Sequence, residues 1–61
     1  MQVKCIETIK NHWLKAGMIL TVTRCDAYGR LYFTNGGVVH KRLFELFGTP
    51  TDFKLFCQFF S

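Results

Sequence analysis

Hydrophobic and polar residues alternate with a period of two along several short stretches of the chain, as in β-strands with one buried face. In the clearest stretch, Met18, Leu20 and Val22 share one face, and threonines occupy the other. Glycine, proline, asparagine and aspartate separate the stretches, and these residues are typical of turns. The pattern predicts strands at residues 2–9, 18–24, 30–34, 38–41 and 53–60.

Two of the predicted strands flank the dipeptide Asn35-Gly36, the strongest short-range signal of a β-hairpin. A type I′ turn requires positive φ at both central residues, and asparagine and glycine tolerate that conformation best. In the strand before the turn, Leu31 and Phe33 then face inward. The sequence therefore predicts a tight hairpin at the centre of a small all-β domain.

Two segments interrupt the alternation. Residues 10–17 form a polar loop with two large apolar residues, Trp13 and Leu14. In residues 42–47 the apolar positions recur at three- and four-residue spacing, which predicts one helical turn with Gly48 as its C-cap. Five short antiparallel strands with a helical turn before the last one are the plan of a small, closed SH3-like barrel.

Parts of the sequence also resemble a known family. The segments 3–6 (VKCI) and 14–22 (LKAGMILTV) are similar to the opening of many short SH3-like proteins encoded by bacteriophages and prophages. Gly29, the turn at residues 35–37 and Phe44 stand in the later positions of that pattern. The resemblance covers roughly residues 3–47, and it implies a small accessory protein that binds a component of the bacterial host. Its motifs are turn and core positions, which specify folding rather than activity.

The chain of 61 residues is long enough for a single domain, residues 1–61, with a thin core. Its seven phenylalanines exceed what such a core needs. The phenylalanine-rich segment 51–61 has no counterpart in the phage proteins, and it is predicted as a C-terminal strand that forms a homodimer. The predicted oligomer interface is Phe56, Phe59 and Phe60. A membrane-surface role fits less well, because Lys54 is the only basic residue of this segment.

The charge of the chain favours an acidic partner. Eight lysines and arginines against four carboxylates give a net charge of +4, without a run of like charges. One interpretation is a nucleic-acid-binding sheet face, in which basic residues contact phosphates and tyrosine stacks on bases. That face would consist of Arg24, Arg30, Tyr32, Lys41 and Arg42. The alternative is that these are ordinary exposed strand residues, and it is favoured because single-strand binders usually carry a stronger charge excess.

A second interpretation is a protein-binding surface. Trp13 lies in the long loop that flanks the ligand groove of SH3-like barrels, and aromatic residues and arginine dominate the hot spots of protein interfaces. The predicted partner-binding residues are Trp13, Tyr28, Arg30 and Tyr32. Equally, Trp13 can fold back with Leu14 to close one end of the barrel.

Nothing in the sequence predicts catalysis, a cofactor or a metal. Cys5, Cys25 and Cys57 are odd in number and far apart, without the short spacing of zinc ligands, and they fit reduced thiols in a cytosolic protein. Cys25 adjoins Asp26, whose charge opposes formation of a thiolate. Without a signal peptide or a membrane-spanning stretch, the chain from Met1 is predicted to be a complete cytoplasmic protein, in the host cytoplasm if a phage encodes it.

The sequence thus supports a non-catalytic binding protein. On the resemblance, the first hypothesis is a phage-type protein that binds a bacterial host protein and inhibits or redirects it. The alternatives are a module that binds DNA or RNA and a small structural or assembly protein that uses its phenylalanine-rich end.

Overall fold

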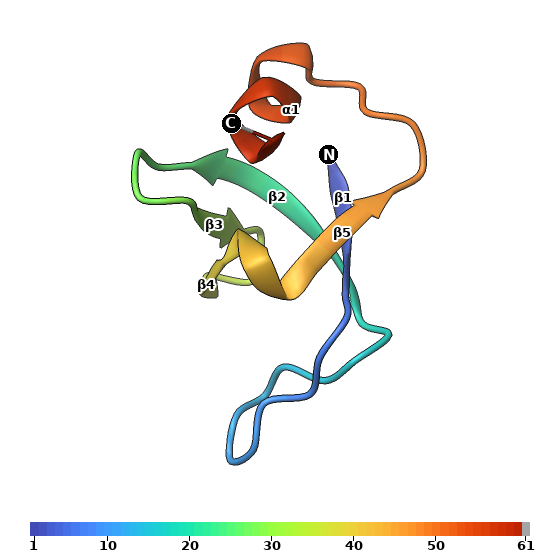
Figure 1. Cartoon of the computed structure of the whole chain (residues 1–61), viewed down its shortest axis with the longest axis vertical. Coiled ribbons are helices and arrows are strands. Elements are labelled where there is room, and N and C mark those ends of the chain that lie inside the picture. Colours follow the sequence, from blue (N-terminus) through green and yellow to red (C-terminus); the bar gives the residue numbers. More distant parts are fainter. Residues whose placement is uncertain (61) are drawn as a thin grey trace.

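The computed structural model describes residues 1–60. Its elements are β1 (Gln2–Cys5), β2 (Ile19–Cys25), β3 (Arg30–Phe33), β4 (Val38–His40), the 3-10 turn η1 (Lys41–Leu43), β5 (Phe44–Phe47) and the helix α1 (Phe53–Phe60). The five strands form one open antiparallel sheet in the order β4-β3-β2-β1-β5 (Figure 1). A mostly β architecture with five antiparallel strands, as predicted, is therefore confirmed. No helix within residues 1–60 is long and apolar enough to cross a membrane.

Strand β2 links the two halves of the sheet. Its first half pairs with β1, where Thr21 lies opposite Gln2, and its second half pairs with β3, where Val22 lies opposite Phe33. The register shifts between Val22 and Arg24, and such a bulge bends a strand and increases its twist. Figure 1 shows β2 as the long, curved strand that passes from β1 to β3. The bulge thus lies directly before Arg24, near the end of β2.

The core is filled from the strands, the long loop and the helix. Leu31 and Phe33 face inward as predicted, and the Phe33 ring packs on that of Phe44 with centroids 5.1 Å apart. Leu14, from the β1–β2 loop, is fully buried. The buried hydrophobic residues of the described chain are Val3, Cys5, Leu14, Val22, Cys25, Leu31, Phe33, Val39, Phe44, Leu55 and Phe59.

The central hairpin has a different turn from the predicted type I′. Gly36 has a positive φ of 87°, whereas Asn35 does not. The Gly36 N–H donates to the carbonyl of Phe33, and the Phe33 N–H donates to the carbonyl of Gly37, both at 3.0 Å. This closes a three-residue loop with glycine at its left-handed position. Asn35 instead accepts a hydrogen bond from the Gly37 N–H at its Oδ1.

The predicted helical turn at residues 42–47 is wrong over most of its length. Only η1 is helical, and β5 follows it directly. Phe44 and Leu46 are also compatible with alternation, and they lie opposite Cys5 and Val3 of β1. Pairing with β1 therefore decides between the two periodicities. Gly48, with a φ of 76°, follows a strand and does not cap a helix.

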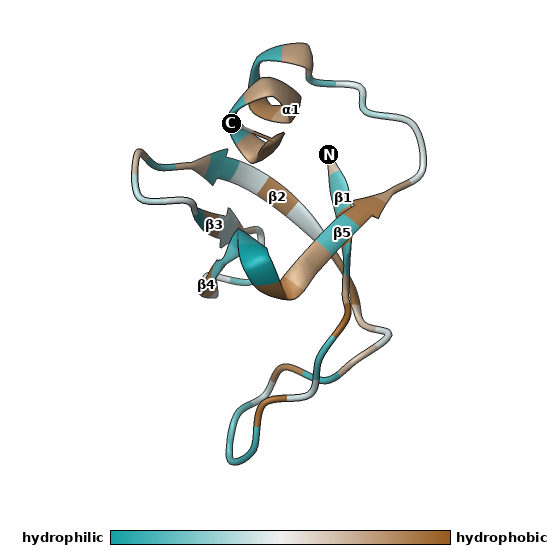
Figure 2. Ribbon diagram, viewed as in Figure 1, coloured by the Kyte–Doolittle hydropathy of each residue, from teal (hydrophilic) through white to brown (hydrophobic). Residues whose placement is uncertain are grey.

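The predicted C-terminal strand is also wrong, because residues 53–60 form α1. Leu55 and Phe59, four residues apart, lie on one helical face and pack into the core. The Oδ1 atom of Asp52 accepts a hydrogen bond from the Leu55 N–H at 3.0 Å, as an N-cap does. In Figure 2, most of α1 is coloured as hydrophobic.

The helix also changes the predicted oligomer interface. Phe59 is 6% exposed and belongs to the core of its own chain, so it is not accessible to a second copy. Phe56 is half-buried and Phe60 is exposed. A C-terminal strand that pairs between two copies is excluded by the helical conformation.

Candidate binding surface at the β2–β3 turn

The turn between β2 and β3 is organised by the side chain of Asp26. Its Oδ1 atom accepts hydrogen bonds from the backbone N–H groups of Tyr28, at 2.9 Å, and Arg30, at 3.0 Å. Gly29 has a positive φ of 81°, and a Cβ there would lie 3.0 Å from Nε2 of His40. Aspartate and glycine at these positions therefore fix the path of the turn against β4.

The second carboxylate oxygen of Asp26 holds two side chains of β3. Its Oδ2 atom accepts a hydrogen bond from Nε of Arg30 at 2.7 Å and another from the Tyr32 hydroxyl at 2.9 Å. The Asp26 side chain is 11% exposed, whereas that of Arg30 is 51% exposed. One nearly covered carboxylate thus fixes an exposed guanidinium and a half-buried tyrosine in place.

These contacts change the pKa of Asp26. Partial desolvation favours the neutral carboxyl, but the hydrogen bonds from Arg30, Tyr32 and the Tyr28 N–H outweigh it. The pKa of Asp26 therefore lies well below its usual range. The carboxylate keeps its charge, and with it the Arg30 ion pair, throughout the neutral and mildly acidic pH range.

Two arginines lie against the two tyrosines of this region. The Arg24 guanidinium carbon is 3.9 Å from the centroid of the Tyr32 ring, and that of Arg30 is 5.3 Å from the Tyr28 ring. Both distances are within the range of cation–π attraction. Tyr28 is 78% exposed. We call this group, Arg24, Asp26, Tyr28, Arg30 and Tyr32, the turn surface.

The structure divides the predicted partner-binding residues. Tyr28, Arg30 and Tyr32 belong to the turn surface, but Trp13 lies at the opposite end of β3, against the β3–β4 turn. A Cβ on Gly37 would lie 2.6 Å from the Trp13 ring, whose centroid is 6.5 Å from that of Phe33 in an edge contact. Trp13 remains 41% exposed, so of the two loop residues considered for closing one end of the barrel only Leu14 is buried.

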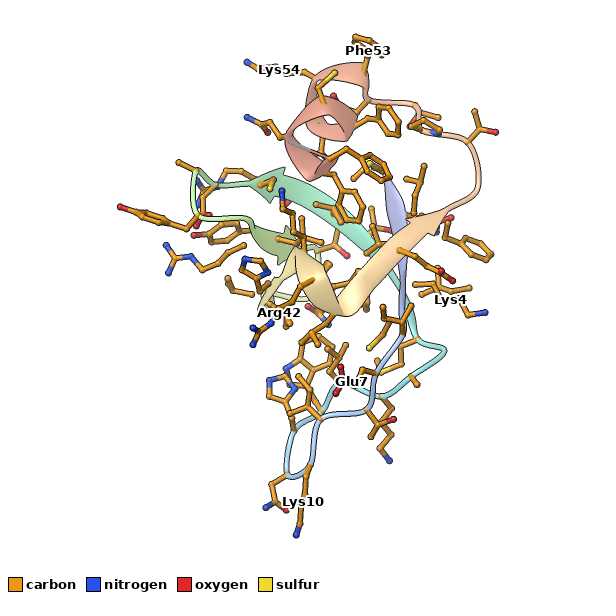
Figure 3. All side chains as sticks on the ribbon, viewed as in Figure 1. Lys4, Glu7, Lys10, Arg42, Phe53 and Lys54 are labelled. Atoms are coloured by element: carbon orange, nitrogen blue, oxygen red, sulfur yellow. The ribbon has the colours of Figure 1, made fainter. Side chains whose placement is uncertain are left out.

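The predicted nucleic-acid residues are divided as well. Arg24, Arg30 and Tyr32 are close together, and Lys41 adjoins the turn because its N–H donates to the Gly29 carbonyl. Arg42 lies on η1, beyond β4, and lines a separate hollow with Glu7 and Ile9. Arg42 and Glu7 are labelled in Figure 3.

The strand register accounts for the position of Arg42. His40 lies opposite Arg30, and Val38 lies opposite Tyr32. Strand β4 ends at His40, so no position of β4 remains for Arg42. The prediction that Arg42 shares a sheet face with Arg30 and Tyr32 is therefore wrong.

The cysteine beside the turn surface is buried. Burial raises the pKa of the Cys25 thiol, Lys41 opposes this shift, and the Asp26 charge adds to it. The thiol is therefore a poor nucleophile at neutral pH. Within residues 1–60, no three histidine, cysteine or acidic side chains gather in a way that could hold a metal ion.

Comparisons with protein-family models, curated proteins and solved structures give no match to this chain. The chemistry of the surface is therefore the basis for assigning a function. On that basis the main residue that sequence reasoning misses is Asp26, whose sequence context indicates a turn residue and a charge beside Cys25 but not a side chain that holds Arg30 and Tyr32. The sequence signal for this contact is spacing: Asp26 precedes Arg30 by four residues and Tyr32 by six. Arg30 and Tyr32 are alternate residues on one strand face, so both side chains can reach back to an aspartate in the preceding turn.

Proposed function

We propose that this chain is a non-catalytic binding protein whose turn surface docks on another protein. The observation that carries this proposal is the Asp26 carboxylate, which fixes Arg30 and Tyr32 while Tyr28 stays exposed. Tyrosine and arginine are enriched in interface hot spots. Side chains that are already ordered lose less conformational entropy when a partner binds.

The sheet supports the further proposal of an SH3-like fold for this binding protein. Strand β2 is shared between β1 and β3, and η1 precedes the last strand, β5. Together with the resemblance of residues 3–47 to short phage proteins, this leads us to propose a bacterial host protein as the partner. Binding at the turn surface would inhibit or redirect that protein.

A protein partner fits the turn surface better than DNA or RNA does. One face of the Tyr32 ring is covered by the Arg24 guanidinium, and the Asp26 carboxylate lies among the basic groups. Arg42, which the nucleic-acid hypothesis needs, lies elsewhere. The basic groups that would contact phosphates are therefore divided between two places, and a base would find Tyr28 as its main stacking platform.

Affinity capture from bacterial lysate tests the proposal. The immobilised chain is incubated with lysate treated with nuclease, beside the variants Tyr28→Ala and Phe53→Ala. Phe53 is a matched control because it is 77% exposed, close to the 78% of Tyr28, and lies on α1. We expect one stoichiometric protein to be retained by the wild type and by Phe53→Ala, and to be lost from Tyr28→Ala.

Other results would contradict the proposal in different ways. Equal retention by wild type and Tyr28→Ala would exclude the turn surface as the docking site. Capture that disappears after nuclease treatment would indicate a nucleic-acid partner. A purified chain that sediments as a stable oligomer and captures nothing would favour the structural or assembly role.

A further inference from the structure

Next to the turn surface, an open groove lies between the end of β2 and the helix α1. It is lined by Arg24 and Cys25 on the strand side and by Asp52, Lys54 and Gln58 on the helix side. Its volume is about 320 Å³, room for a side chain together with several waters of about 30 Å³ each. Arg24 belongs both to this groove and to the turn surface.

The groove carries an excess of positive charge. Arg24 and Lys54 line it and are exposed. Beside the groove, Nζ of Lys41 donates a hydrogen bond to the carbonyl oxygen of Gln58, which also lines the groove, at 3.4 Å. Within residues 1–60, neither Arg24 nor Lys54 has an ion pair of its own. The one carboxylate in the lining, Asp52, accepts the Leu55 N–H at the start of α1.

We propose that this groove is a second part of the binding surface and takes carboxylate side chains from an acidic, extended segment of the protein partner. The inference rests on the proposed function and adds the chemistry of the partner. Arginine binds carboxylates through paired N–H groups, and lysine adds a point charge. Because Arg24 is common to both regions, a segment that contacts Tyr28 continues across Arg24 toward Lys54.

The groove fits an acidic peptide better than a nucleic acid. None of the residues that line it is aromatic, so a base would find no ring to stack on. An acidic segment needs only anionic groups at intervals along an extended backbone. The positive charge of the whole chain, +4, works in the same direction by steering acidic partners toward it.

Titration of the full chain, labelled with ¹⁵N, with a hexaglutamate peptide tests this inference directly. Hexalysine and a six-nucleotide oligothymidylate serve as comparison probes. We expect saturable shifts of the backbone amides of Arg24, Cys25, Lys54 and Leu55 with hexaglutamate and none with hexalysine. The oligothymidylate should bind more weakly than hexaglutamate, because the groove offers it no stacking platform.

Two lysine variants with the same change of charge sharpen the titration. Figure 3 shows Lys54 on α1 and Lys10 at the far end of the β1–β2 loop, at opposite ends of the molecule. Lys54→Ala should weaken hexaglutamate binding by about two- to fivefold, the range of a surface charge pair. Lys10→Ala should leave the binding unchanged within error.

The outcomes separate this inference from the proposed function. Shifts spread evenly over all lysines, or equal effects of Lys10→Ala and Lys54→Ala, would overturn the groove as a site. Tighter binding of the oligothymidylate at the same amides would overturn the acidic peptide as its occupant. If lysate capture depends on Tyr28 but not on Lys54, the groove inference fails and the proposed function stands, whereas indifference to Tyr28 contradicts the proposed function itself.

Discussion

Two exposed aromatic surfaces of this molecule differ in what holds their rings. In the turn surface, Tyr32 donates its hydroxyl to Asp26 and lies under Arg24, so its orientation is fixed by directional contacts. On the outer side of α1, the rings of Phe53, Phe56 and Phe60 follow one another, with successive centroids 6.5 and 4.9 Å apart, and the Phe60 ring also lies 4.9 Å from that of the buried Phe59. We call Phe53, Phe56 and Phe60 the helix face.

Exposed aromatic area alone therefore does not define a specific binding surface. Ring–ring contacts of the helix face are apolar, so they remove surface from water but present no charge or hydrogen-bonding group that a partner has to match. The turn surface presents charge, hydrogen-bonding groups and rings in one arrangement. Such a surface is specific because a wrong partner leaves its charges and hydrogen-bonding groups unpaired.

The largest expected effect is a difference in the free energy of unfolding between substitutions on the buried and the exposed side of α1. Phe59→Ala removes a buried ring and should lower the free energy of unfolding by about 3–5 kcal/mol. Phe60→Ala, on the helix face, should lower it by less than about 1 kcal/mol, because Phe60 is 62% exposed. Urea unfolding followed by circular dichroism measures both. Equal losses would mean that the helix does not pack on the sheet through Phe59.

If Phe59→Ala does not fold, Phe59→Leu provides the comparison. This substitution retains much of the buried apolar volume and should lower the free energy of unfolding by about 1.5 kcal/mol or less. The outcome that matters is that substitution of Phe60 lowers the free energy of unfolding less than substitution of Phe59 by the same residue does.

The next effect compares two arginines. Arg24→Ala removes the guanidinium that is shared by the turn surface and the groove, and it should weaken partner binding about tenfold, which corresponds to about 1.4 kcal/mol. Arg42→Ala makes the same change in charge on η1, and it should change affinity less than twofold because only long-range attraction is lost. Calorimetric titration with the captured partner measures both. Equal losses would indicate attraction to net charge rather than a defined surface.

The smallest expected effect is the pH dependence of the free energy of unfolding that arises from the Asp26 carboxylate. Because the pKa of Asp26 is lower in the folded chain than in the unfolded one, its contribution to stability is complete above the unfolded value of about 4. It is lost as pH falls from there toward the folded value. The difference in stability between wild type and Asp26→Asn should therefore be constant from pH 7 to pH 5 and shrink below about pH 4. A difference that stays constant down to pH 2 would show that the carboxylate is not stabilised by its contacts.

The sequence predicts some of these features and not others, for physical reasons. The strand containing Leu31 and Phe33 is predicted correctly, because its alternation fits only one periodicity. Residues 53–60 fit two, since their apolar residues occur both at alternate positions and four apart. The Asp52 N-cap favours the helix, and packing of Leu55 and Phe59 against the sheet selects it.

The candidate site is predictable in composition but not in arrangement. Tyrosine and arginine on β3 are visible as an outward-facing set in the sequence. Their grouping around Asp26, and the distance of Trp13 and Arg42 from them, depend on strand register and on where β4 ends. A one-residue change of register would place different side chains on that face, and the local pattern does not fix it.

The affinity of Asp26→Asn for the captured partner tests most directly whether Asp26 organises the turn surface. Asparagine can still accept the backbone hydrogen bonds of the turn, but it loses the Arg30 ion pair. If Asp26 positions Arg30 and Tyr32, the variant binds its acidic partner at least about fivefold more weakly, although it has lost a negative charge. If Asp26 acts only as a charge, removing it reduces repulsion, and unchanged or tighter binding would contradict the account.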